Sequence, residues 1–187
     1  MLLNNIPCLD KGYVSTISSH NDSQKLVDIA NHLLTPYQVS EKLLQLSSLT
    51  LLIKCPLFIQ LNLAQYGFTI LYAKSTPEVE AYLPNEAEVN TPELETSRLI
   101  MNDIKQTTEA LLINPKAYNA DGCDKFTSQV MTPISVYTTI ITHGSYDQWK
   151  RFTAQVNLPA QIESYRSAVE QIVEVEWKYG QIKDFTK

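Results

Sequence analysis

The chain has 187 residues, of which 44% are hydrophobic and 19% are charged. These values fit one globular domain over 1–187. We expect the polar tail at 178–187 to fray. The net charge is −5, and the twelve lysines and three arginines form no cluster, which disfavours a nucleic-acid partner. No apolar run is long enough to span a bilayer, and the start MLLNNIPCLD lacks the features of a secretory signal. The three cysteines form no CxxC pair. We therefore expect a cytoplasmic protein with no membrane partner.

The first half of the chain alternates between predicted strands and helices. Runs of β-branched and aromatic residues predict strands over 12–18, 49–54 and 68–73. Capping residues and helix-starting prolines predict helices over 22–34, from Thr35 through Leu46, and from Pro56 to near Gly67.

The second half begins with a predicted surface loop over 75–90, because prolines and acidic residues gather there. A helix starting at 91–93, a loop over 114–124 and a short helix from Asp124 through Met131 are predicted next. A strand over 135–142, bounded by Gly144, follows. The last predicted elements are a helix over 145–156 with Trp149 and Phe152 inward and a final helix that begins at Leu158-Pro159. The final helix carries an apolar stripe made of Ile162, Tyr165, Val169, Ile172 and Val175. Together these elements predict an α/β protein of the α+β type, with a mixed sheet flanked by helices.

No residue pattern marks a catalytic or metal site. The three histidines are not spaced as ligands, and GxSxG, GxGxxG and Walker-type loops are absent. Glu163, Arg166 and Glu170 have helical spacing and are more typical of a solvated face with ion pairs than of paired catalytic acids. Ser145 follows a strand and precedes a helix, and we favour a role as the helix cap over an anion site.

The order of several short segments resembles the flavin-dependent thymidylate synthases (ThyX) over about Gly12 to Trp177. The segments are TPYQ at 35–38, IKCPLF at 53–58, AYLP at 81–84, THGSYDQW at 142–149 and AQIE at 160–163. The resemblance implies FAD, dUMP, a folate methylene donor and a nicotinamide reductant, in a homotetramer whose active sites form between subunits.

The chain departs from the ThyX pattern where that family carries its arginines. The RHR triplet of the family is Gln65-Tyr66-Gly67 here, and the arginine of its SxRY segment is Pro77. Three further family positions differ: the arginine–glutamine pair before the triplet is Leu61-Asn62, the GSLR arginine is Asp147, and the arginine of the LR pair is Val156. Arginine binds phosphate through charge-assisted, bidentate hydrogen bonds, so these losses make dUMP binding doubtful.

Two hypotheses follow from this departure. The first is a ThyX-like pseudoenzyme that acts as a binding or assembly subunit, as a homo-oligomer or in a hetero-assembly with another protein. The alternative is an active flavin-dependent thymidylate synthase, or a related dUMP-modifying flavoenzyme, with a rearranged site. The candidate nucleotide-binding residues are Ser75, Arg151, Gln161 and Arg166; FAD is possible by resemblance alone, and no catalytic residue is assigned.

Aromatic residues near the altered triplet are the candidates for an interface. Tyr66, Phe68 and Trp149 could anchor a partner, since aromatic side chains are enriched at interfaces. For Phe68 and Trp149 the sequence favours ordinary core positions.

Overall fold

The computed structural model describes residues 5–20, 47–72, 80–89, 94–120 and 134–176. The helices predicted over 22–34, 35–46 and 124–131, and the candidate residue Ser75, lie outside these ranges. Contacts divide the chain into two compact units, one made of 1–55, 59–74 and 139–187 and the other of 56–58 and 75–138. The prediction of one domain over 1–187 stays a prediction.

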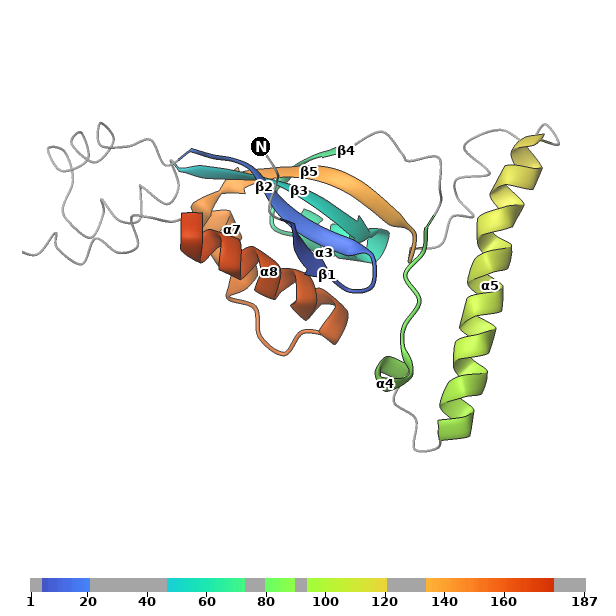
Figure 1. Cartoon of the computed structure of the whole chain (residues 1–187). Helices are drawn as coiled ribbons and strands as arrows, with labels where there is room; N and C mark the ends of the chain where they lie inside the picture. The colour runs from blue at the N-terminus through green and yellow to red at the C-terminus, as the bar shows by residue number, and fades with distance from the viewer. Residues whose placement is uncertain (1–4, 21–46, 73–79, 90–93, 121–133, 177–187) are drawn as a thin grey trace, which may run out of the picture. The chain divides into compact units, whose positions relative to one another are not determined.

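The protein is a mixed α/β protein built around a five-stranded sheet (Figure 1). Its strands are β1 (Ile6–Cys8), β2 (Gly12–His20), β3 (Ser48–Pro56), β4 (Thr69–Tyr72) and β5 (Tyr137–Ser145), in the order β1-β2-β3-β5-β4. The described registers of β1 with β2, β2 with β3 and β4 with β5 are antiparallel. The sheet is antiparallel, so the predicted mixture of parallel and antiparallel strands was wrong. The short strand β1 was not predicted.

Strand β3 lies at the centre of the sheet, and its side chains alternate between a fully buried face and a half-buried one. Leu49, Leu51 and Ile53 are at most 1% exposed, whereas the residues between them are partly accessible. Val14 of β2 lies opposite Ile53, and the register shifts between Thr16 and Ser18 through an irregularity in β2. This alternation is what a strand with one face in the core requires.

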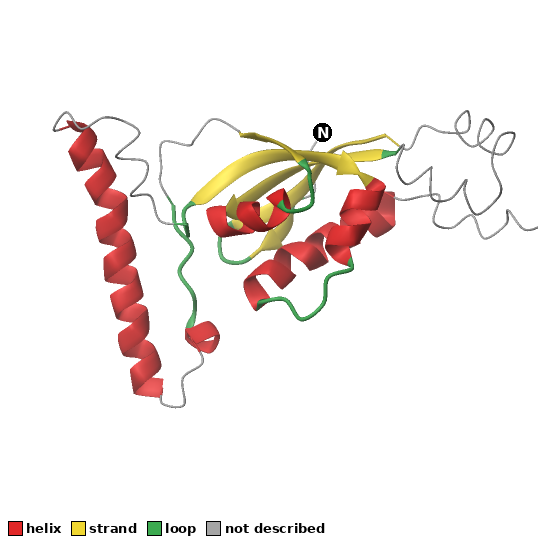
Figure 2. Ribbon diagram, turned by 180° about the vertical axis from the view of Figure 1, so that it is seen from behind, coloured by secondary structure: helices red, strands yellow, loops and turns green. Residues whose placement is uncertain are grey.

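Helices α3 (Leu57–Ala64), α7 (Tyr146–Thr153) and α8 (Ala160–Glu176) all lie on the same face of the sheet (Figures 1 and 2). The buried stripe of α8 contains Tyr165, Ala168, Val169, Ile172 and Val173. Val175, which we expected in this stripe, is 74% exposed. Val173 takes its place because it follows Val169 by four residues and so shares its face of the helix.

The second unit contains α4 (Glu86–Val89) and the long helix α5 (Leu94–Ala120). Two loop predictions were wrong here. The loop predicted over 75–90 contains α4, which begins at a reciprocal cap between Asn85 and Glu88. The loop predicted over 114–124 is helical through Ala120, so the helix continues past Pro115, which lacks a backbone donor.

Candidate functional site

The segment Gln65-Tyr66-Gly67, where the resemblance expects a cationic triplet, forms a tight turn after α3. The amides of these three residues donate to the carbonyls of Asn62, Leu63 and Ala64, respectively. Gly67 has φ +70°, a left-handed conformation that ends a helix and that side-chain-bearing residues rarely adopt. The turn carries no positive side chain, and strand β4 begins two residues after it, at Thr69.

The side chain of Gln148, on α7, holds this turn in place. Its Nε2 donates to the carbonyls of Tyr66 and Gly67 at 3.2 and 2.9 Å, and its Oε1 accepts from the amide of Ser145 at 2.8 Å. The Ser145 hydroxyl accepts from the Gln148 amide, which completes a capping box at the start of α7. Ser145 is therefore a helix cap, as the sequence favoured.

The rings of four residues form an aromatic cluster next to the turn: Tyr66 of the turn itself, Phe68, Trp149 and Phe152. The rings of Phe68 and Trp149 stack with centroids 4.1 Å apart, and Tyr66 meets Phe152 edge-on at 5.6 Å. Trp149 and Phe152 are fully buried, and Trp149 Nε1 donates to the carbonyl of Leu49. The predicted core role of Phe68 and Trp149 is confirmed, while Tyr66 is half-buried.

Gly144 is needed for this cluster rather than for a turn. It lies inside β5, two residues beyond the predicted end of the strand, and is buried. A Cβ atom at this position would lie 2.4 Å from the ring of Phe68. The glycine therefore allows the strand to continue under an aromatic ring.

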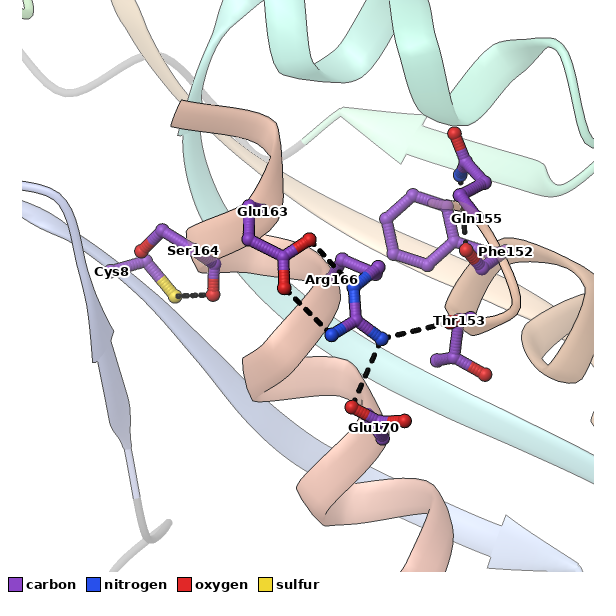
Figure 3. A network of polar contacts seen from close by, with 8 residues as sticks. All are labelled: Cys8, Phe152, Thr153, Gln155, Glu163, Ser164, Arg166 and Glu170. Carbon is purple, nitrogen blue, oxygen red and sulfur yellow. Dashed lines mark hydrogen bonds and ion pairs between the residues drawn. The ribbon is translucent and has the colours of Figure 1, made fainter. Parts of the chain in front are cut away.

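Arg166, a candidate phosphate ligand, is occupied by groups of the protein itself (Figure 3). Its Nε and Nη2 donate to the two carboxylate oxygens of Glu163 at 2.8 and 2.7 Å. Its Nη1 donates to Glu170 at 3.0 Å and to the carbonyl of Thr153 at 2.8 Å. These hydrogen bonds lower the pKa of Glu163 below its ordinary value and raise the pKa of Arg166.

The other candidate residues do not join Arg166 in a common site among the described contacts. Arg151, on α7, is exposed and pairs with Asp147 of the same helix at 3.3 Å. Gln161 lies half-buried in the first turn of α8. Two positions where the resemblance expects arginine instead expose aliphatic side chains, since Leu61 is 55% and Val156 is 76% exposed.

The two cysteines within the described residues, Cys8 and Cys55, offer no reactive thiol. Both are buried thiols. Burial raises the pKa of Cys8 to about 12 and raises that of Cys55 as well. Both thiols are therefore protonated at neutral pH and are poor nucleophiles.

Sequence reasoning missed Gln148 as the residue that fixes the turn. Its spacing of three from Ser145 is the signal of a capping box. The further contacts of its side chain with Tyr66 and Gly67 bridge more than 80 residues, and no local pattern predicts them.

No family model and no curated protein sequence matches this chain. Across the described residues, no group of three or more histidine, cysteine, aspartate or glutamate side chains could hold a metal ion. The helices within the described ranges include none long and apolar enough to cross a membrane.

Proposed function

We propose that this chain is a divergent ThyX-like protein that has no thymidylate synthase activity of its own and acts as a binding or assembly subunit. One observation carries the proposal: each described arginine in the candidate set pairs with a carboxylate of its own helix. Arg166 pairs with Glu163 and Glu170, and Arg151 pairs with Asp147. A nucleotide phosphate would have to displace these carboxylates, and it would meet their negative charge while doing so.

The turn at 65–67 supports the same proposal. It contains no cation, and the carbonyls of Tyr66 and Gly67 already accept hydrogen bonds from Gln148. A phosphate needs donors, whereas this turn directs two acceptors toward Gln148. The turn is thus built for internal packing and lacks the charge that dUMP would require.

A binding role also fits the replacement of expected arginines by exposed aliphatic residues. Leu61 and Val156 leave more than half of their surface accessible, and an aliphatic side chain has neither the charge nor the hydrogen-bond donors that a phosphate requires. We propose a cytoplasmic protein that assembles with copies of itself, as a tetramer by resemblance, or with another protein. FAD is possible by resemblance only, and nucleic acid and membrane are not proposed as partners.

The test combines three measurements on the purified full chain. We expect no dUMP-dependent oxidation of a reduced nicotinamide, whether or not flavin absorption remains after incubation with FAD and desalting, and a light-scattering mass above that of one chain. dUMP-dependent oxidation would overturn the proposal and favour an active flavoenzyme with a rearranged site. A clean monomer at micromolar concentration would contradict the assembly role while leaving the loss of activity intact.

A further inference from the structure

The guanidinium of Arg166 is surrounded by oxygen atoms of the protein. Glu163 places two carboxylate oxygens on two adjacent N–H groups of the guanidinium, at 2.8 and 2.7 Å. This is the bidentate arrangement in which arginine also binds phosphate. Glu170 adds a third anionic contact at 3.0 Å, so two carboxylates face one cation.

The two glutamates lie on the solvent side of the arginine. The side chain of Arg166 is 15% exposed, whereas those of Glu163 and Glu170 are 44% and 43% exposed. Removing the carboxylates would therefore open the outer edge of the guanidinium to solvent. The inner Nη1 contact with the carbonyl of Thr153, at the end of α7, would still hold the arginine in place.

We infer that Glu163 and Glu170 occupy a phosphate-binding position on Arg166, here called the phosphate seat, and so exclude phosphate-bearing ligands from this arginine. This inference rests on the proposed loss of nucleotide binding and deepens it: Arg166 supplies a cation, and two carboxylates of the same helix block it. Exclusion follows from charge, because an arriving phosphate would face a local pair of carboxylates against a single guanidinium.

The experiment measures pyrophosphate binding to the full chain by isothermal titration calorimetry. The variant E163A/E170A removes both carboxylates and keeps good helix-forming residues on α8. We expect its pyrophosphate affinity to exceed that of the unaltered protein by about tenfold or more, as a regained charge-assisted bond implies. The matched control, E163A/E170A/R166Q, should lose the gain. Far-ultraviolet circular dichroism confirms that each variant is folded.

If E163A/E170A does not fold, E163Q/E170Q replaces it, because glutamine keeps the side-chain size and removes only the charge. A folded double variant that gains no pyrophosphate affinity overturns the inference and leaves the proposed function standing. A gain that persists in the triple variant also overturns it, because the seat would then not be Arg166. Pyrophosphate binding by the unaltered protein that is lost in R166Q would contradict both the exclusion and the proposed loss of phosphate binding.

Discussion

The aromatic cluster and the Arg166 cluster both join α7 to neighbouring segments, and they do so by different physics. The aromatic cluster connects α7 to the turn after α3 through buried rings, such as Phe68 stacked on Trp149. The Arg166 cluster connects the end of α7 to α8 through charge-assisted hydrogen bonds near the surface. Burial makes the first cluster sensitive to shape, whereas exposure of the carboxylates leaves the second open to screening by solvent and salt.

Under the proposed function, this contrast explains how a packed framework persists while a nucleotide site is lost. Apolar residues such as Trp149 are constrained by packing, and their loss would cost stability. Exposed residues such as Val156 are under no such packing constraint. Four predictions test this contrast, from the largest expected effect to the smallest.

The first prediction concerns the centre of the aromatic cluster. Trp149→Ala should lower the free energy of unfolding by about 3–5 kcal/mol, because it leaves a large cavity and removes the hydrogen bond to Leu49. Urea unfolding measures this loss. Trp149→Phe serves as the control and should lose clearly less, since a ring still stacks on Phe68. A loss below about 1 kcal/mol for Trp149→Ala would show that the region is not core.

The second prediction separates two glycines that border the cluster. Gly144→Ala should cost about 1–3 kcal/mol through overpacking, because the new Cβ would lie 2.4 Å from the Phe68 ring. Gly67→Ala should cost about 1 kcal/mol through its left-handed backbone, since the nearest atom is 3.6 Å away. NMR chemical shifts of the Phe68 ring should move with Gly144→Ala and stay nearly unchanged with Gly67→Ala. The opposite pattern would contradict the close approach.

The third prediction concerns the link between α7 and the turn. Gln148→Ala should cost about 0.5–2 kcal/mol, as expected for loss of a capping residue. Hydrogen exchange should quicken at the Ser145 amide, which donates to Gln148. Gln155→Ala is the matched control, because among the described residues that side chain donates to the carbonyl of Phe152, three residues earlier in the chain. Equal effects from both variants would argue against a specific role for Gln148.

The fourth prediction concerns the pH dependence of the Arg166 cluster. The pKa of Glu163 is lower in the folded protein than its ordinary value of 4.5, mainly through its hydrogen bonds with Arg166. Its contribution to stability is therefore present above about pH 4.5 and is lost as the pH falls through the folded pKa. Unfolding free energies measured from about pH 6 to pH 3 should decline less steeply in Glu163→Gln than in the unaltered protein.

Glu174→Gln is the control for this measurement, because Glu174 is exposed on the same helix and has no ion pair among the described residues. It should leave the pH dependence nearly unchanged. If Glu163→Gln and Glu174→Gln behave alike, the Arg166 cluster does not contribute measurably to stability. Since Glu163 is 44% exposed, we expect the smallest of the four effects here.

The sequence by itself determined most of the local structure in the first compact unit, which contains the sheet. Runs of β-branched and aromatic residues predicted β2, β3 and β4, and the position of Ser145 between a strand and a helix predicted the cap of α7. These features depend on residues near one another in the chain, where side-chain periodicity and capping operate. Local patterns were wrong at two boundaries: the strand bounded by Gly144 in the sequence prediction continues through that residue, and the loop predicted from residue 114 is helical to Ala120.

Only the tertiary structure decided what the candidate site residues do. The sequence could place Arg166 at helical spacing from Glu163 and Glu170, but not the contact of its Nη1 with the Thr153 carbonyl of another helix. It could not show that Gln148 reaches the carbonyls of Tyr66 and Gly67, or that Gly144 makes room for Phe68. The physical reason is that local patterns set which face of an element is apolar, whereas hydrogen bonds and ring contacts between distant segments depend on how those faces pack together.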